Sequence, residues 1–528
     1  MDRRNVLKSA AILAVAGLFP TAGLSASGIS SAMASDAHDA LTPEQARKLA
    51  MDPRRPQFHL LPRHNWMNDP NGPIYWKGMY HMFFQYNPTA AVWGDMHWNH
   101  AVSLDRVHWR HLPIALSPTP GGPDAAGCFS GTAVDDNGVV TVLYTGVVDT
   151  TEAKETIPGS NPPMRESQCL ATSTDPDLIV WHKEPRAVIA APPADMAIAG
   201  FRDPAPWRSG DWWYMAIGSG MPGVGGEILL YRSRDLRAWE YLHKLVEGRG
   251  SGRRTSNLVD DGDMWECPDF FALDDQYVLL HSTEGHVHWQ SGSLDQSAMK
   301  FHPEQAGLVD NGNFYAAKTQ TDQSGRRILW GWINEQRPEA EYSAAGWAGM
   351  MSLPRVLRLR SNGQLHMEFD PTLHKLRKDG QSLAIEASTT ANQVQALKIW
   401  QATGEFAAIL GRGDQPFQLA MAGHLPSGNL DTPVFTLAYD PKNPEQLMLD
   451  GKPVYLAPGS AQALHLHAYV DGSVIELLIE GQIAYTKRFY YEGDMAPDLW
   501  LKMEGDVAAL EKLQVWQIRP ISTDRLTS

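Results

Sequence analysis

A segment that recurs every 60 to 70 residues constrains the fold of this chain more than any other feature of its sequence. In each copy a serine is followed two residues later by an aspartate, and an aromatic residue comes four to six residues after that. The copies are Ser103 and Asp105 with Trp109, Ser173 and Asp175 with Trp181, Ser233 and Asp235 with Trp239, and Ser293 and Asp295 with Phe301. Aspartate often caps a turn, so each copy predicts an outer hairpin whose aromatic residue packs between neighbouring units.

Short apolar or alternating runs between the copies are typical of strands, namely residues 139–146, 212–220 and 277–283. Five aromatic-rich segments recur along the same part of the chain: residues 66–74, 129–133, 201–207, 265–271 and 314–318. A β-rich unit repeated at this period is typical of propeller blades. We therefore predict an all-β chain that begins with a five-bladed β-propeller over residues 55–358.

The pattern changes after residue 355. A short helix is expected around residues 373–376, and alternating strands separated by Gly, Asp and Pro follow, for example at residues 434–440, 463–481 and 513–518. Such strands predict an antiparallel sandwich. We expect a linker over residues 359–384 and a β-sandwich domain over residues 385–528.

Three short acidic segments lie on the predicted inner strands of the propeller: Asp69 in residues 66–72, Asp203 in residues 201–204 and Glu266 in residues 266–269. Any one of these acids alone would be explained better as a cap on a turn before proline. Inner strands line the axis, so three acids from three blades can converge. Breaking a glycosidic bond needs one carboxylate to attack or stabilise and another to donate a proton, so this set predicts a carbohydrate site.

The stretch WMNDPNGPIYWKGMYHMFFQYNP (residues 66–88) resembles the β-fructosidases of glycoside hydrolase family 32, which include invertases, inulinases and levanases. Residues 201–204 and 266–271 match the same family in the same order, as do residues 129–131, 346–355 and 471–476. The resemblance covers roughly residues 60 to 490. It implies the same propeller and sandwich, and release of terminal fructose from sucrose, levan or inulin.

The resemblance also implies roles for the three acids. Asp69 would be the nucleophile that forms a fructosyl-enzyme, and Glu266 would be the acid and base of a retaining mechanism. Asp203 would bind fructose hydroxyls and stabilise the transition state. Further substrate contacts are implied at Asn68, Gln85, Trp93, Phe129, Ser130 and Arg202. Trp98 is equally well explained as a core residue.

Charge and cysteine content exclude several other classes of function. The net charge is −15 and no basic cluster follows the first residues, which argues against a nucleic acid or an anionic membrane as partner. No Cys and His spacing resembles a zinc site, so we expect neither a metal nor another cofactor. The three cysteines do not form a disulfide framework, and Cys267 is expected to be a small buried residue.

Residues 1–34 are typical of an export signal. Arg3 and Arg4 precede an apolar stretch too short to span a bilayer, and a small-residue cleavage site follows. The paired arginines resemble a twin-arginine signal, although a Sec signal can also begin this way. The mature protein is expected in the periplasm or outside a bacterial cell, without a membrane anchor once the signal is removed.

Two alternatives to hydrolysis remain open at this point. A fructosyltransferase would use the same intermediate and a sugar acceptor, whereas a non-catalytic sugar-binding propeller would have no need for a nucleophile and acid pair. The sequence leaves the choice among sucrose, levan and inulin open. It also leaves the oligomeric state open.

Overall fold

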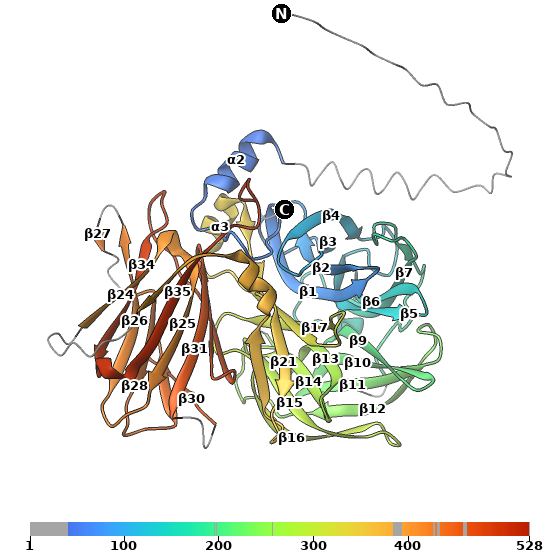
Figure 1. The fold of residues 1–528 in the computed structure, drawn as a ribbon. Helices are drawn as coiled ribbons and strands as arrows, with labels where there is room; N and C mark the ends of the chain where they lie inside the picture. The colour runs from blue at the N-terminus through green and yellow to red at the C-terminus, as the bar shows by residue number, and fades with distance from the viewer. Residues whose placement is uncertain are drawn as a thin grey trace, which may run out of the picture.

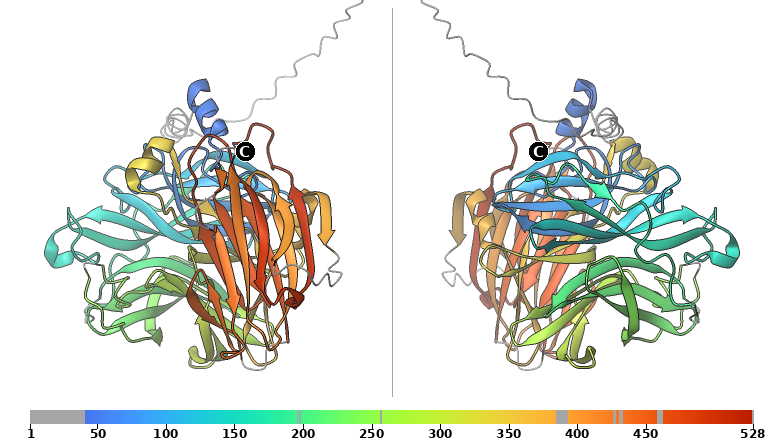
Figure 2. Two further views of the ribbon diagram at one scale, coloured as in Figure 1. Left: turned by 90° about the vertical axis from the view of Figure 1, so that its left-hand side faces the viewer. Right: turned by 90° about the vertical axis from the view of Figure 1, so that its right-hand side faces the viewer.

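The computed structural model describes residues 41–526, except residues 195, 197, 256, 384–392, 426–427, 430–432 and 458–461. Within these residues, five β-sheets form a propeller and two further sheets form a sandwich beside it (Figure 1). In Figure 2 the sandwich lies in front of the propeller in the left view and behind it in the right view. The predicted fold, an all-β chain with a five-bladed propeller followed by a β-sandwich, is confirmed.

Each blade contains four antiparallel strands, and its first strand lies nearest the axis. Blade one has β1 (Asn65–Trp76), β2 (Met79–Asn87), β3 (His97–Ser103) and β4 (Trp109–Leu116); blade two has β5 (Gly127–Asp136), β6 (Val139–Asp149), β7 (Met164–Ser173) and β8 (His182–Lys183); blade three has β9 (Phe201–Ser209), β10 (Trp212–Met221), β11 (Gly225–Ser233) and β12 (Trp239–Glu247); blade four has β13 (Glu266–Leu273), β14 (Gln276–Thr283), β15 (His286–Asp295) and β16 (Lys300–Leu308); blade five has β17 (Tyr315–Thr321), β18 (Arg327–Ile333), β21 (Arg355–Leu359) and β22 (Leu365–Phe369).

A short segment after β18 connects blade five to blade one. Its strand β19 (Trp347–Ala348) pairs in parallel with β1, and β20 (Met350–Met351) pairs with β18. The inner strands β1, β5, β9, β13 and β17 are neighbours in this order, and β17 also contacts β1. The first strands of the five blades therefore surround one central axis.

The serine and aspartate repeats form the outer hairpins, as predicted. In each, the aspartate carboxylate accepts backbone N–H bonds in the turn between the third and fourth strands; these residues are Asp105, Asp175, Asp235 and Asp295. The aromatic residues also pack between blades. Trp109 meets Trp330 of blade five at 5.5 Å between ring centroids, and Trp181 meets Phe83 of blade one at 5.6 Å.

The sandwich consists of two antiparallel sheets around an aliphatic and aromatic core. One sheet contains β23 (Arg377–Leu383), β35 (Leu510–Ile518), β25 (Thr403–Gly411), β31 (Ala463–Asp471), β32 (Val474–Ile479) and β33 (Ile483–Arg488); the other contains β24 (Gln393–Ile399), β34 (Asp498–Gly505), β26 (Phe417–Leu425), β28 (Phe435–Tyr439), β29 (Gln446–Leu449) and β30 (Lys452–Tyr455), with β27 (Gly428–Asn429) paired to β26.

The connection between the domains is shorter than the linker expected over residues 359–384. Within that range β22 completes blade five and β23 already belongs to the sandwich, so the 3₁₀ helix η2 (Pro371–Leu376) is the connection. It contains the short helix expected around residues 373–376. The other helical elements are α2 (Pro43–Met51), α3 (Glu339–Ala345), η1 (Glu152–Lys154), η3 (Trp400–Ala402) and η4 (Val507–Ala509).

A fully buried ionic network joins the two domains. Arg355 of blade five donates to Glu476 of the sandwich at 2.6 Å and to Asp310 at 2.9 Å. The ring of His59 contacts Asp471 at 2.8 Å and Glu476 at 3.0 Å. Burial alone would lower the pKa of His59, but these two carboxylates raise it to about 9. The network fixes the sandwich against the propeller.

The predicted signal peptide, residues 1–34, lies outside the described residues. Across the part of the chain that the structure describes, no helix is long and apolar enough to cross a membrane.

Candidate active site

All five inner strands depart from regular pairing near the same end of the axis. In each blade the pairing register between the first and second strands shifts at a β-bulge. The residues that flank the bulge on the first strand are Met67 and Pro70, Phe129 and Gly131, Arg202 and Ala205, Glu266 and Asp269, and Tyr315 and Lys318. A β-bulge bends its strand and re-aims side chains. Here the bulges direct residues of different blades toward the shared axis.

Three of these bulges hold a non-glycine residue in the left-handed region, with φ of 65° at Asp203, 50° at Cys267 and 54° at Ala316. Such backbone costs on the order of 1–3 kcal/mol per residue, and it persists where the surroundings determine it. Strain at equivalent positions of three blades, beside Arg202 and Glu266, marks this end of the axis as the functional one.

A pocket of about 480 Å³ opens at this end of the axis. All nine residues that sequence reasoning selected line it: Asn68, Asp69, Gln85, Trp93, Phe129, Ser130, Arg202, Asp203 and Glu266. They come from four of the five blades and from the loop after β2. Residues of six separate segments thus meet in one cavity.

The carboxylate of Asp69 accepts three hydrogen bonds inside the pocket. Ser130 Oγ donates to its Oδ2 at 2.7 Å, Asn68 Nδ2 donates to Oδ1 at 3.1 Å, and Cys267 Sγ lies 3.5 Å from Oδ2. Burial raises the pKa of Asp69 and the charge of Glu266 adds to this, while the three donors oppose the rise. The hydrogen bonds therefore favour the ionised form, in which the carboxylate is a nucleophile.

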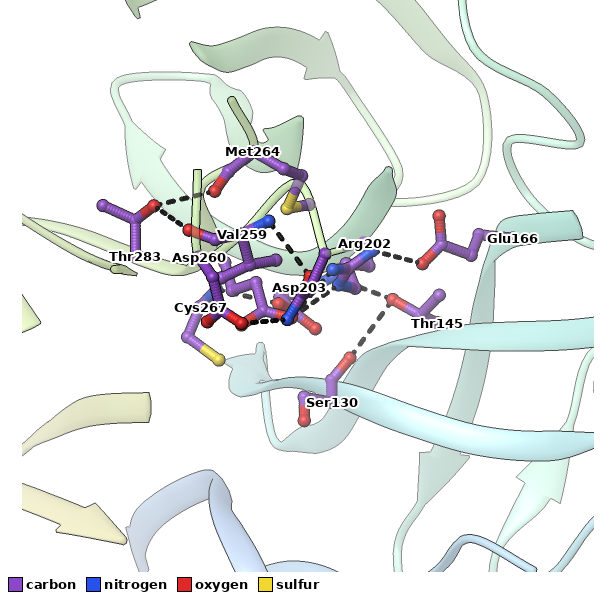
Figure 3. A network of polar contacts seen from close by, with 12 residues as sticks. Ser130, Thr145, Glu166, Arg202, Asp203, Val259, Asp260, Met264, Cys267 and Thr283 are labelled. Carbon is purple, nitrogen blue, oxygen red and sulfur yellow. Dashed lines mark hydrogen bonds and ion pairs between the residues drawn. The ribbon is translucent and has the colours of Figure 1, made fainter. Parts of the chain in front are cut away.

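Glu266 directly precedes Cys267 in the chain and is held by two other side chains. Arg202 donates to its Oε1 through Nε at 3.1 Å and Nη2 at 2.8 Å, and the Tyr315 hydroxyl donates to Oε2 at 2.7 Å. The third nitrogen of Arg202 donates to Glu166 Oε1 at 2.9 Å (Figure 3). Burial raises the pKa of Tyr315 well above its usual value, so its hydroxyl keeps its proton.

Asp203 belongs to the same network of polar contacts, shown in Figure 3. The backbone N–H of Cys267 donates to its Oδ2 at 2.8 Å, and its own N–H donates to Thr145 at 2.9 Å. Burial raises its pKa to about 7, with Arg202 opposing the shift and the other two pocket acids adding to it. The protonation of Asp203 therefore depends on the charges that surround it.

Aromatic rings form the wall of the pocket that is exposed to solvent. Trp93 is 55% exposed and meets Phe129 edge to face at 5.9 Å between centroids. Trp332, which sequence reasoning did not select, packs against Trp66 at 5.8 Å. Trp98 is fully buried and lies in the core between blades one and two, so the core explanation holds for it.

The sequence analysis did not identify Ser160, Asn161 and Tyr315, which line the pocket, or Glu166, which contacts Arg202. Tyr315 belongs to one of the five aromatic-rich segments, and its place on an inner strand could have identified it. Glu166 lies on β7, the third strand of blade two, and carried no such signal. It is fully buried, and its second oxygen accepts bonds from the Phe201 N–H at 2.6 Å and Thr156 Oγ1 at 2.9 Å.

The charges of the pocket suit a neutral, hydroxyl-rich ligand. Among the described residues that line it, Arg202 is the only cation, and all three of its guanidinium nitrogens donate to Glu166 or Glu266. Asp69 and Asp203 add further negative charge. Carboxylates, amides and a hydroxyl can bind sugar hydroxyls, and the exposed rings can pack against the apolar face of a sugar.

The chain is similar to known proteins along nearly its whole length. The model of the glycosyl hydrolases family 32 N-terminal domain matches residues 59–368, and that of the family 32 C-terminal domain matches residues 359–517. Sucrose-6-phosphate hydrolase of Escherichia coli is 36% identical over 494 residues, which cover 88% of this chain and 94% of that protein. Raffinose invertase of Escherichia coli is 32% identical and covers 83% of this chain and 90% of its own length.

Solved structures show the same relationship. A Bombyx mori β-fructofuranosidase, solved as a mutant in complex with sucrose, superimposes with a TM-score of 0.73 at 30% identity. The match covers 93% of this chain and 99% of that one.

Proposed function

This chain belongs to glycoside hydrolase family 32 and acts on β-fructofuranosides, and we propose that it releases terminal fructose from unphosphorylated substrates, such as sucrose, with retention of configuration. The observation that carries the proposal is the charge of the pocket. Three carboxylates, Asp69, Asp203 and Glu266, line the pocket, and its one guanidinium is already paired with Glu266 and with Glu166 behind it.

In the proposed reaction, Asp69 attacks the anomeric carbon of the fructosyl unit while Glu266 protonates the departing oxygen. Water, deprotonated by Glu266, then releases fructose from the covalent intermediate. Asp203 binds the fructose hydroxyls, and the fixed backbone N–H of Cys267 orients its carboxylate. The remaining pocket residues, Asn68, Gln85, Trp93, Phe129, Ser130 and Arg202, hold the sugar or the acids in place.

Sucrose 6-phosphate is the second candidate substrate, because one of the relatives with high coverage is a sucrose-6-phosphate hydrolase. A phosphate group is bound best by Arg or Lys side chains that can donate to its oxygens. Three of the five N–H groups of Arg202 already donate to Glu166 or Glu266, and the nearby carboxylates repel a dianion. Both arguments favour the unphosphorylated sugar.

The test is a comparison of kcat/KM for sucrose and sucrose 6-phosphate with the purified enzyme at equal ionic strength. We expect sucrose to be preferred at least tenfold, and added salt to narrow the gap because it screens the repulsion. A preference for sucrose 6-phosphate would refute the substrate assignment. Parallel assays on raffinose, inulin and levan, with all products quantified over time, separate release of single fructose units from internal cleavage.

Transfer to a sugar acceptor uses the same covalent intermediate. In that case a sugar hydroxyl, rather than water, attacks the intermediate in the second step of the reaction. We expect hydrolysis to dominate at low sucrose concentration and trisaccharides to appear only at high concentration. Predominant transfer at low sucrose would assign the enzyme as a fructosyltransferase.

Export to the periplasm or beyond forms part of the proposal, and the sequence of residues 1–34 supports it. Replacing Arg3 and Arg4 by lysine should leave the protein in the cytoplasm if the twin-arginine route is used. Unchanged export of this double variant would favour the Sec route, and a cytoplasmic wild-type protein would contradict export.

A further inference from the structure

The five inner strands form a second cavity at their other ends. Whereas their first residues line the active-site pocket, their last residues line a cavity of about 580 Å³. Exposed residues at its rim, among them Asp135 and Arg208, open it to solvent. We propose that this distal cavity is a second, non-catalytic binding site for a neutral monosaccharide or disaccharide.

Aromatic side chains from three blades contribute to the wall of the distal cavity. Trp207 of blade three packs on Phe270 of blade four at 5.0 Å, and Tyr277 stacks on the same ring at 5.4 Å with an interplanar angle of 13°. Tyr75 of blade one also lines the cavity. Trp207, Tyr277 and Tyr75 are half-buried, so each leaves part of a ring for the apolar face of a sugar.

Polar groups without partners lie in the same wall. Gln320, on β17, is 3% exposed, and neither its side-chain nitrogen nor its side-chain oxygen has a hydrogen-bond partner in the structure. The indole nitrogen of Trp207 is also buried without one. Leaving such groups unpaired is costly, so native proteins rarely do so. A ligand with several hydroxyl groups can both donate to and accept from this set, which an apolar ligand or a simple ion cannot do.

The charged groups of the distal cavity favour a neutral ligand. Arg208 and Asp135 lie at its rim, while Arg327 and Asp269 lie deeper, so the two signs are balanced. Arg327 stacks on Phe271 at 4.4 Å and donates to Thr319 Oγ1, and the same threonine donates to Asp269. Each of the deeper charges thus retains hydrogen-bonding capacity for sugar hydroxyls without attracting an ion of either sign.

A buried lysine separates the distal cavity from the active site. Lys318 of β17 donates across the axis to the Pro268 carbonyl of β13 at 2.7 Å and to Thr132 Oγ1 of β5 at 3.3 Å. It is 1% exposed, and the carbonyl that it binds lies between Glu266 and Asp269 along β13. A sugar in the distal cavity therefore cannot pass through to the acids, and it would occupy a site of its own.

The experiment counts bound sugars in the full chain. The Asp69→Asn variant is used because it should not turn over its substrate. It is titrated with sucrose and, separately, with fructose by calorimetry and ligand-observed NMR. Crystals soaked in each sugar then locate the bound molecules. We expect two sugars per chain. Adding Gln320→Met to this variant keeps the shape of the side chain but removes its amide, so the affinity of the distal cavity for sugar should fall at least tenfold. Adding Trp207→Ala instead should have the same effect.

Trp93→Ala is the matched control. It alters the aromatic wall of the active-site pocket, so it should weaken sugar binding there and leave binding in the distal cavity unchanged. Gln320→Met in the otherwise wild-type enzyme should keep kcat/KM on sucrose within twofold. The proposal would be overturned if only one sugar binds per chain and its affinity falls in Trp93→Ala but not in Gln320→Met. The proposed function would remain intact in that case. A second sugar found anywhere other than the distal cavity would overturn it equally.

Discussion

Replacing Glu166 by glutamine is the perturbation that tests how the pocket is held together. Glu166 does not line the pocket, and its Oε1 accepts the 2.9 Å bond that fixes one end of Arg202. The other end of Arg202 holds Glu266 at 2.8 Å. We therefore expect Glu166 to act on the reaction through Arg202, as a positioning residue.

The size of the effect follows from these bonds. Hydrogen bonds to charged groups contribute about 1.5–3 kcal/mol. The bond between two charged groups lies near the top of this range and a bond from the guanidinium to a neutral amide lies near its bottom, so the Arg202 contact weakens by about 1–1.5 kcal/mol. That corresponds to a loss of roughly 5- to 15-fold in kcat/KM. The new amide also meets the Phe201 N–H, which now donates to Oε2 at 2.6 Å, and this clash increases the loss.

The assay measures kcat, KM and the pH profile on sucrose alongside thermal unfolding. Glu227→Gln is the matched control: Glu227 is also buried and pairs with Lys244 at 2.7 Å, but it lies in blade three and does not line the pocket. We expect both variants to lose stability, and only Glu166→Gln to lose kcat/KM and shift the pH profile. Wild-type kinetics in a folded Glu166→Gln protein would refute the reasoning.

The remaining predictions concern catalysis, pH and metals. Asp69→Asn or Glu266→Gln should lower kcat by several orders of magnitude without unfolding the protein, and near-normal turnover by either would contradict the roles proposed for them. Glu266→Ala should recover part of its activity on a fructoside with a good leaving group, because that step needs less proton donation. Burial lowers the pKa of His81 and of His288 to about 4, so the stability that they contribute is present above about pH 6.5 and is lost as pH falls toward 4. The pKa of His59 is raised to about 9, so this residue contributes stability below about pH 6.5 that is lost as pH rises through 9. Unfolding temperatures across this range should therefore peak near neutrality, and a steady rise in either direction would be inconsistent with these shifts. Activity should survive EDTA, since the acid and base pair suffices for the chemistry; loss that one divalent ion reverses would reveal a required metal.

The sequence predicts most of this fold because its repeat is a direct consequence of the architecture. The outer hairpins of blades one to four use the same turn, so Asp105 and Asp235 recur with the same spacing to their aromatic partners. The first strand of each blade must also line the axis. For that reason the positions of Asp69, Asp203 and Glu266 within the repeat are enough to place all three in one pocket.

Other features depend on contacts that the repeat does not encode. Glu166 reaches the site from a third strand, through the guanidinium of Arg202, and no local pattern distinguishes it from a surface glutamate. The sequence pattern ends the propeller too early because β22 is short and has the alternating pattern of either domain; its pairing with β21 assigns it to blade five. The distal cavity, too, becomes visible only when the ends of five strands are brought together.

The initial anomer of the released fructose tests the central claim, that Asp69 forms a covalent intermediate, most directly. Two successive inversions at the anomeric carbon restore the starting configuration, so fructose should leave first as the β-anomer, before mutarotation mixes the forms. Carbon NMR or polarimetry at early times is the suitable measurement, because the anomeric carbon of fructose carries no hydrogen. Initial release of the α-anomer would mean that water attacks the sugar directly and that Asp69 acts as a base.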